Sequence, residues 1–362
     1  MAKVTKYKFN TKSILAVLEK WVNLESPTFN APAVNNMMDL CSNYLAEMGG
    51  RLERIPGKNN LADCLRASFN ETSENIDKPG ILIMGHMDTV HPIGTIKKLP
   101  FRIEGNKCYG PGIFDMKSGN LIAIEAIRML QKENNLPTLG IKILITSDEE
   151  IGSPSTRELI EAESSRAKYV LVPEPGLPDG SYVSGRYAIA RFNLKTEGVP
   201  FHAGINPKAG KSAIKEMAKK IIEIESMSDE NRTFSVGVIN GGEWVNCVSS
   251  ACNAEAISMA KKQKNLDEGI STILSMNKKN AEIKFSVEQG VVRPVWELNN
   301  GTKELFDLTQ EICKTLKLPF SHGSMGGGSD GNFSGALGVP TIDGLGTLGE
   351  NYHTLKEHIY ID

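Results

Sequence analysis

Two short stretches of the chain place histidine and carboxylate groups directly after apolar runs. In GHMDTVH, His86 and Asp88 stand two residues apart behind the run ILIM at 81–84, and in TSDEEIGS three acidic residues follow the run IKILIT at 141–146. Short apolar runs of this kind are typical of buried strands in α/β sheets. Open α/β sheets bind their ligands beyond the carboxyl ends of such strands. We therefore predict a functional site at that edge.

Three further stretches supply the same kinds of group: YGPGIFDMKSG, VPEPG and GENYHTLKEH. Each follows a predicted strand or lies in a glycine-rich loop. Two imidazoles and several carboxylates are the ligand set of a zinc pair, whose ions lie roughly 3.5–4 Å apart in two-metal sites. A single His-x-Asp or one acidic run would most often be a loop hydrogen bond or a solvated surface. The candidates that together carry the prediction are His86, Asp115, Glu149, Glu150, Glu174 and His353.

The elements that must position these groups follow from hydrophobic periodicity. Strands are predicted at 81–84, 141–146 and 168–172, and they alternate with a helix at 118–132 and a helix that opens near Pro154. Strands that alternate with helices indicate a mainly parallel mixed sheet flanked by helices. The predicted fold class is therefore α/β.

The pattern changes after residue 186. In AIARFNLKT, apolar and polar residues alternate, which is typical of a strand with one buried face. The order strand, helix, strand, strand, helix, strand that follows is that of a split α/β sandwich. We predict an inserted domain at 187–291 between two parts of a catalytic domain, 1–186 and 292–362. Its later elements are expected at 211–225, 233–239, 253–259, 266–277 and in EIKFSVEQ.

Composition limits the classes of partner. The formal net charge is −2 and no long basic run occurs, so no nucleic-acid partner is expected. The chain has no signal-like N-terminal run and nowhere roughly 18 consecutive apolar residues, which predicts no membrane partner and a cytoplasmic location. Six cysteines occur without a C-x-x-C pair, so reduced, buried or inert thiols are expected.

Seven motifs resemble one known family: GHMDTV, YGPGIFDMKSG, TSDEEIGS, PEPG, FHAG, MGGGSDG and NYH, in this order and at these separations. They resemble the di-zinc exopeptidases that include glutamate carboxypeptidase, succinyl-diaminopimelate desuccinylase and aminoacylase. The resemblance runs from about residue 10 to the C-terminus. It implies two Zn²⁺ ions, with Co²⁺ or Mn²⁺ as substitutes, and a small peptide or N-acyl amino acid as substrate. It also implies a homodimer formed through the inserted domain, which would serve as a lid.

The resemblance assigns roles to the metal-site residues by position. His86 would bind one zinc and His353 the other, Glu150 and Glu174 would each complete the shell of one metal, and Asp115 would bridge the two. Asp88 would hold the ring of His86 by a hydrogen bond from behind. Glu149 would act as general base toward a zinc-bound water, whose pKa falls from 15.7 to about 7, and would then protonate the departing amine.

Further roles fall on the inserted domain and on the glycine cluster. His202, in FHAG, would stabilise the oxyanion and would reach the active site of the other protomer. Asn246, in WVNCV, would lie near the bound substrate. The resemblance also places substrate contacts at the glycine cluster MGGGSDG, through Gly328 and Ser329.

The chain departs from the family pattern where relatives carry an arginine that contacts the substrate carboxylate. NAEAISM has Ile257 at that place, so Arg293, in VVRPVW, is the remaining candidate. Within the family, Glu at the position of Glu174 goes with carboxypeptidases and deacylases, and Asp with aminopeptidases. We predict a zinc-dependent hydrolase that releases a C-terminal amino acid or deacylates an N-acyl amino acid, with a di- or tripeptidase as the alternative.

The sequence gives less support to two other classes of function, a nucleotide-binding protein and a non-enzymatic binding protein. GINPKAGKS, at 204–212, resembles a phosphate loop but has five residues instead of four between Gly and Gly-Lys-Ser, and no apolar strand runs directly into it. A non-enzymatic binding protein is the different-class alternative; loss of Glu149 or of a metal ligand would favour it, and neither is lost. The other histidines are expected to be rim or loop residues: His91, His322 and His358.

Overall fold

The computed structural model describes residues 6–205, 209–277 and 282–361. The chain forms two compact units. Unit 1 comprises Met1–Arg186, Trp296–Met325 and Ser329–Asp362, and unit 2 comprises Tyr187–Val295 and Gly326–Gly328. The short glycine stretch of unit 2 comes from a part of the chain far beyond the rest of that unit.

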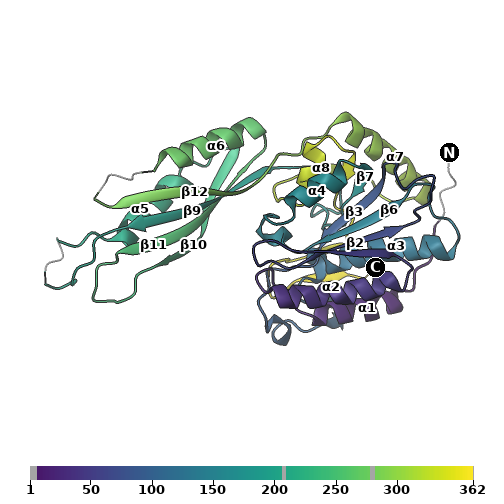
Figure 1. The fold of residues 1–362 in the computed structure, drawn as a ribbon, viewed down its shortest axis with the longest axis horizontal. Coiled ribbons are helices and arrows are strands. Elements are labelled where there is room, and N and C mark those ends of the chain that lie inside the picture. Colours follow the sequence, from purple (N-terminus) through teal and green to yellow (C-terminus); the bar gives the residue numbers. More distant parts are fainter. Residues whose placement is uncertain (1–5, 206–208, 278–281, 362) are drawn as a thin grey trace. The chain divides into compact units, whose positions relative to one another are not determined.

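Unit 1 is built on a six-stranded sheet with the order β1-β2-β6-β3-β7-β14 (Figure 1). β6, β3, β7 and β14 pair in parallel, whereas β2 is antiparallel to both of its neighbours. The predicted mainly parallel mixed sheet is confirmed. The strands are β1 Arg51–Ile55, β2 Cys64–Phe69, β3 Gly80–His86, β6 Ile141–Thr146, β7 Ala167–Leu171 and β14 Thr341–Ile342.

Helices cover both faces of this sheet (Figure 1). Successive side chains of a strand point to opposite faces. Ile83 accordingly packs in the core beneath one helix layer, and its neighbours Leu82 and Met84 pack in the core beneath the other. The first layer contains α1 (Thr11–Asn23), α2 (Ala31–Ala46) and α3 (Ser118–Lys132), and the second contains α4 (Arg157–Ser164) and α8 (Gly331–Ala336). A further helix, α7 (Asn300–Leu316), packs against Ile342 of β14.

Helix α3 and strand β6 have the predicted bounds. Helix α4 instead begins at Arg157, three residues after Pro154. The carboxylate of Asp148 accepts hydrogen bonds from the backbone N of Ser155, at 2.6 Å, and from the hydroxyl of Thr156. These bonds hold both residues in a turn before the helix. The prediction of a start near Pro154 was therefore early.

Short strands join the C-terminal segment to the middle of the chain. In a four-stranded sheet of order β15-β16-β5-β4, His358 of β16 is paired with Tyr109 of β5. The C-terminal residues thus lie beside the chain that leads into Asp115. The remaining short elements of unit 1 are β4 Arg102–Glu104, β5 Lys107–Tyr109, β8 Tyr182–Arg186, β13 His322–Met325, β15 Gly349–Glu350, β16 His358–Tyr360 and a 3₁₀ turn at Thr95–Lys97.

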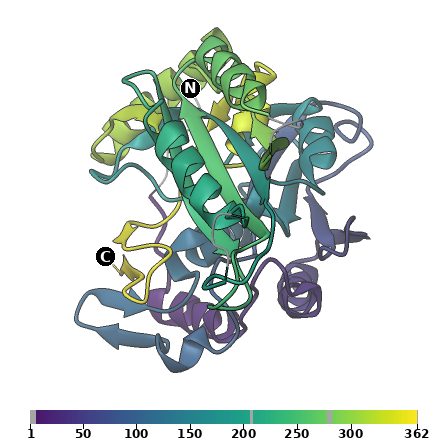
Figure 2. The same cartoon turned by 90° about the vertical axis from the view of Figure 1, so that its left-hand side faces the viewer.

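Unit 2 has the predicted order of elements. Its antiparallel sheet, β10-β11-β9-β12, carries both helices of the unit on one face, and Figure 2 shows α5 lying along the strands. Along β9, Phe192 and Leu194 are buried under the helices while Asn193 and Lys195 are exposed, as the alternation predicts. The elements are β9 Ala188–Glu197, α5 Ala213–Glu225, β10 Arg232–Gly241, β11 Ala251–Ala260, α6 Gln263–Ser275 and β12 Lys284–Arg293.

The segment that resembles a phosphate loop ends at a helix cap. Residues 206–208 of GINPKAGKS lie outside the described residues. Lys211 forms a β-bridge with Val199, and the hydroxyl of Ser212 accepts a hydrogen bond from the backbone N of Lys215. Helix α5 therefore begins at Ala213 and not at 211, because Lys211 is bound in the bridge and Ser212 serves as the cap.

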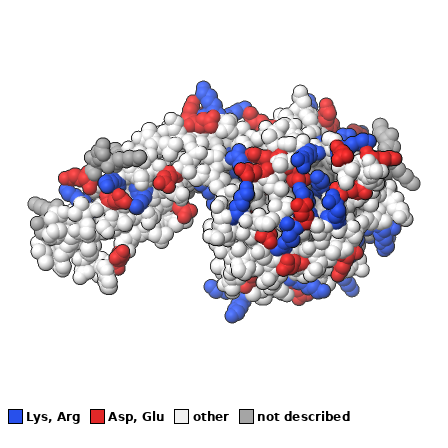
Figure 3. Space-filling view, in the orientation of Figure 1, with Lys and Arg blue, Asp and Glu red and all other residues white. Residues whose placement is uncertain are grey.

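The charged surface, the character of the helices and the cysteines bear on the predictions made from composition. On the face drawn in Figure 3, Lys and Arg side chains lie among Asp and Glu side chains. Among the described residues, no helix has the length and apolar character to cross a membrane; the cytoplasmic location stays a prediction.

Burial raises the pKa of the thiols of Cys41, Cys64 and Cys108 to about 12, which makes them unreactive. Cys247 is exposed, and all six cysteines are free, as expected of reduced thiols.

Candidate metal centre and active site

The parallel strands of unit 1 bring the candidate ligands to one edge of the sheet. β3 ends at His86, β6 is followed by a short 3₁₀ turn at Glu149–Ile151, and Glu174 comes shortly after β7. Because β3 pairs in parallel with both β6 and β7, the carboxyl ends of all three strands lie together. The sequence-predicted site therefore has the required scaffold.

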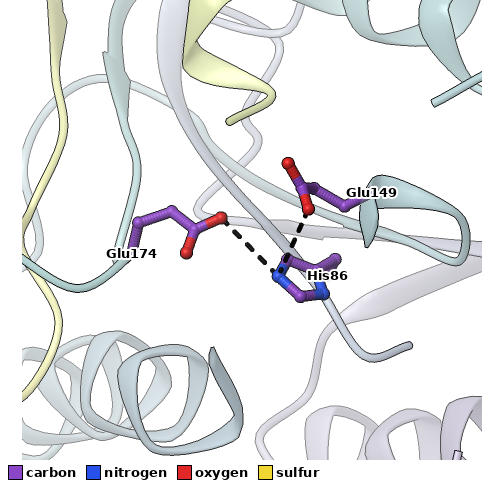
Figure 4. Close-up of side chains that lie close together, drawn as sticks. All are labelled: His86, Glu149 and Glu174. Carbon is purple, nitrogen blue, oxygen red and sulfur yellow. Dashed lines mark ion pairs between the residues drawn. The ribbon is translucent and has the colours of Figure 1, made fainter. Parts of the chain in front are cut away.

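His86 presents one ring nitrogen to a group of carboxylates. Its Nδ1 lies 2.9 Å from the carbonyl oxygen of Asp88, which can only accept, so Nδ1 carries a proton. Its Nε2 lies 3.1 Å from Oδ1 of Asp115, 3.6 Å from Oε1 of Glu174 and 3.9 Å from Oε2 of Glu149. Figure 4 shows Glu149 and Glu174 pointing toward this same nitrogen. Nε2 is thus the atom of His86 that can serve as a metal ligand.

Asp115 lies between the two imidazoles. Its Oδ1 faces His86, and its Oδ2 lies 3.1 Å from Nε2 of His353, which in turn lies 3.3 Å from Oε2 of Glu150. Asp115 belongs to an irregular turn at Ile113–Lys117, where its φ of −116° and ψ of 95° are not helical. With one oxygen toward each imidazole, Asp115 has the arrangement expected of a ligand shared by two metals.

The electrostatics of this cluster favour bound cations. Burial, and then the negative charge of Asp115, raise the pKa of Glu150 to about 8 and that of Glu174 well above its usual value. Hydrogen bonds to Asp115 and Glu150 raise the pKa of His353 to about 11. Burial lowers the pKa of His86, but its hydrogen bonds to Asp115 and Asp88 outweigh burial and raise it. The chain concentrates negative charge here.

The donor set fits a metal. Two groups place their ligand atoms within 4.8 Å of one another: His86, Glu149 and Glu174 in one, and His86, Asp115 and Glu150 in the other. Imidazole nitrogen and carboxylate oxygen are zinc ligands. Glu149 is as well placed to be a ligand as to be a base, so distance alone does not separate these roles.

Asp88 supports several members of the cluster. Its carboxylate accepts hydrogen bonds from the backbone N of Glu149 at 3.2 Å, from that of Glu150 at 3.3 Å and from the hydroxyl of Thr28 at 2.7 Å. The sequence predicts that this carboxylate also holds the ring of His86. It lies 3.4 Å from Nδ1, farther than the carbonyl oxygen of the same residue. Thr28, which the motifs do not single out, adds to this support.

Two glycines allow close packing around the backbone that carries Glu174. A Cβ atom on Gly119, in α3, would lie 1.9 Å from the carbonyl oxygen of Pro173, and a Cβ atom on Gly346 would lie 2.5 Å from the same oxygen. Such distances exclude any larger residue without a backbone shift. The Pro173–Glu174 backbone is thus held between two segments that tolerate only glycine.

His202 and Asn246 lie on adjacent segments of unit 2. The backbone N of Ala203 donates to the carbonyl oxygen of Asn246 at 3.0 Å, and His202 forms a β-bridge with Cys247. The backbone N of Gly204 donates to Nδ1 of His202 at 3.1 Å, so Nε2 is the ring nitrogen that carries the proton. The exposed side chain of His202 therefore presents a hydrogen-bond donor.

The predicted substrate residues divide between the two units. In unit 2, a Cβ atom on Gly328 would lie 2.9 Å from Cδ of the buried Arg293, so these two residues adjoin. Ile257 of β11 is paired with Arg191 of β9, which places a guanidinium on the same sheet face. In unit 1, the buried hydroxyl of Ser329 donates to Asp343. The substrate role of Ser329 stays a prediction.

Two imidazoles and four carboxylates gathered at one edge of the sheet are the donor set expected of a metal-dependent hydrolase. Comparison with known proteins agrees: the model of peptidase family M20/M25/M40 matches residues 82–362, and the chain belongs to this family. The resemblance inferred from the motifs is confirmed, and the protein is a metallohydrolase.

Named relatives include two enzymes that match nearly the whole chain. Carboxypeptidase G2 of Pseudomonas sp. (strain RS-16) is 30% identical over 97% of this chain and 85% of that protein. A succinyl-diaminopimelate desuccinylase of Hydrogenovibrio crunogenus is 27% identical over 96% of this chain and 94% of that protein.

Solved structures share the fold. A tripeptidase of Staphylococcus aureus matches with a TM-score of 0.73 and 23% identity, over 97% of this chain and 94% of that chain. A metallo-carboxypeptidase of Sulfolobus solfataricus matches with a TM-score of 0.72 and 17% identity, over 96% of this chain and 95% of that chain.

The packing around Glu174 gives a first prediction. Replacing a helical glycine by alanine normally stabilises a protein by about 0.4–1 kcal/mol. Gly119→Ala should instead lower the melting temperature and weaken metal retention during dialysis, because the new Cβ meets the backbone of Pro173. Gly140→Ala is the control, since its Cβ would meet nothing closer than 3.8 Å. A Gly119→Ala protein as stable and as rich in metal as the control would contradict this packing.

Proposed function

We propose that the protein is a zinc-dependent amidohydrolase that releases a C-terminal amino acid from a small peptide or removes the acyl group of an N-acyl amino acid. The observation that carries this proposal is the position of Asp115 between His86 and His353. The names of the relatives, a carboxypeptidase and a desuccinylase, support both forms of the reaction. A di- or tripeptidase at the same site is the alternative.

In this proposal each metal has its own pair of ligands and shares a third. His86 and Glu174 would hold one Zn²⁺, Glu150 and His353 would hold the other, and Asp115 would be shared by both. Co²⁺ or Mn²⁺ are the expected substitutes. The bound ions supply Lewis acidity toward the amide carbonyl and lower the pKa of water. Their charge also offsets the repulsion among the buried carboxylates.

Glu149 is proposed as the general base. Its side chain is mostly buried, its backbone N is held by Asp88, and its Oε2 lies 3.9 Å from Nε2 of His86. We assign it the acceptance of a proton from the attacking water and the donation of that proton to the leaving amine nitrogen. Such proton transfers contribute roughly 10²–10⁴-fold to rate.

His202 is proposed to donate a hydrogen bond from Nε2 to the oxyanion, in the active site of a partner subunit. A homodimer through unit 2 is supported by its surface. β10 stands at the edge of the sheet of unit 2 and carries Val238 and Ile239, which are exposed apolar residues. Trp244 and Val245, in the loop that follows, are exposed as well. Edges and apolar patches of this kind favour association.

The role of Glu149 is tested by its amide. Glu149→Gln should keep two metals per chain and lose about 10²–10⁴-fold in kcat, because an amide cannot accept the water proton. Glu150→Gln is the matched comparison and should lose a metal. Metal content by elemental analysis, measured beside turnover, decides the case. A Glu149→Gln protein that loses a metal would make Glu149 a ligand, and one with full turnover would remove it from the mechanism.

The shared active site is tested by complementation. His202→Ala and Glu149→Gln chains should each be inactive alone, with the first costing about 10²–10³-fold in kcat, the usual worth of one oxyanion donor. Mixing them should restore activity, because each heterodimer would contain one intact site. Native mass spectrometry verifies subunit exchange. Absence of recovery in a verified heterodimer would place His202 at the site of its own chain or outside catalysis.

The predicted carboxylate contact of Arg293 gives a preference between substrates. Guanidinium–carboxylate pairs form two charge-assisted hydrogen bonds that an amide cannot reproduce. Substrates with a free carboxylate should therefore be hydrolysed in preference to their amides, and Arg293→Ala should remove most of that difference in kcat/KM. Arg232→Ala, in the same unit but paired with Asp229 and Glu268, should leave it unchanged. Equal losses on both substrates in Arg293→Ala would indicate a purely structural arginine.

A further inference from the structure

Glu357 is a fully buried carboxylate close to the metal cluster but outside the predicted ligand set. Its Oε1 accepts hydrogen bonds from the backbone N of Phe114 at 2.8 Å and of Asp115 at 3.1 Å. Its Oε2 accepts from the backbone N of Gly112 at 3.0 Å and from Nε2 of His91 at 2.6 Å. A carboxylate has about four lone-pair sites, so four donors fill its capacity.

The backbone of the Asp115 turn needs such an acceptor. Between Gly112 and Lys117 the φ and ψ angles of Asp115 and Met116 are not helical, so the turn lacks a regular series of internal hydrogen bonds. Buried backbone N–H groups require partners. The side chain of Glu357 satisfies three of these N–H groups. Two of them belong to Phe114 and Asp115, so the bonds hold the backbone from which the Asp115 side chain projects.

The same carboxylate connects the three stretches that carry the ligands around Asp115. His91 belongs to the stretch that contains His86, Gly112 and Phe114 belong to the Asp115 turn, and Glu357 follows His353 in the C-terminal segment. The carbonyl oxygen of Glu357 also accepts a long hydrogen bond from the backbone N of Gly110, at 3.4 Å. His91 lies in a loop, as one form of the prediction has it, but it is a buried partner of Glu357 and not a rim histidine.

We propose that Glu357 is a positioning residue for the metal centre. Its hydrogen bonds fix the backbone of Asp115 so that Oδ1 faces His86 and Oδ2 faces His353. Glu357 itself binds neither metal nor substrate. This inference rests on the proposed function, since it takes Asp115 to be the ligand shared by both metals.

Glu357→Gln is the test variant, because it keeps the shape of the side chain and replaces one acceptor oxygen by an NH₂ group that cannot accept from a backbone N–H. Glu163→Gln is the matched control. Glu163 is also a buried carboxylate of unit 1, but it is paired with Arg66 and Lys142. Both variants should lower thermal stability, so a general loss of stability does not distinguish them.

Metal binding distinguishes Glu357→Gln from Glu163→Gln. Apoprotein is titrated with Zn²⁺ to obtain affinity and stoichiometry, and the visible absorption of Co²⁺-loaded protein reports ligand geometry. We expect Glu357→Gln to bind metal about 10–100-fold more weakly, the usual effect of removing a group that orients a ligand, and to show an altered Co²⁺ spectrum. We expect Glu163→Gln to match the wild type in both. Turnover of Glu357→Gln should fall mainly in kcat, because substrate contacts remain.

The outcomes separate this inference from the proposed function. Wild-type affinity and spectrum in Glu357→Gln would overturn the positioning role while leaving the two-metal site intact. Failure of the wild type to bind two metals would overturn the proposed function and this inference with it. If Glu357→Gln does not fold, Glu357→Asp is compared instead, because it keeps the charge but withdraws the carboxylate by one methylene; an unchanged metal affinity in that variant would equally overturn the role.

Discussion

The structure depends on holding several carboxylates of like charge close together in a mostly buried place. Asp115, Glu149, Glu150 and Glu174 converge near Nε2 of His86, and burial together with their mutual repulsion raises the pKa of two of them. Burying several carboxylates together destabilises the folded protein unless opposite charges or hydrogen bonds compensate. Two kinds of partner offset this cost. Bound cations are expected to neutralise the charge of the ligands, while hydrogen bonds from backbone N–H groups stabilise the buried carboxylates of Asp88 and Glu357 behind them.

Two supporting carboxylates, Asp88 and Glu357, show the same physical pattern. Each accepts hydrogen bonds from backbone N–H groups of a loop that carries predicted ligands, Asp88 from the loop of Glu149 and Glu150, and Glu357 from the turn of Asp115. Because the donors are backbone N–H groups, these bonds fix the backbone position of each predicted ligand. The ligand's own side chain stays available for metal. The regular sheet brings the loops near one another, and these carboxylates determine their detailed geometry.

The sequence is informative where the signal is local. β6 and α3 have the predicted bounds because a short, mainly apolar run and a clear helical period determine them. His86, Asp115 and His353 are selected as candidate ligands because each lies in a recognisable motif. Glu357 and the burial of His91 cannot be predicted in this way, since their importance comes from contacts between stretches more than two hundred residues apart in sequence. The start of α4 is missed for a similar reason, because the side chain of Asp148 holds the residues before it.

The most direct test of the proposed metal centre is a crystal structure of the zinc-loaded protein with anomalous scattering measured at the zinc edge. Two anomalous peaks are expected, one on either side of Asp115: the first bound by His86 and Glu174, the second by Glu150 and His353, with Glu149 coordinated to neither. A single peak, or a zinc coordinated by Glu149 in place of Glu174, would contradict the proposed centre.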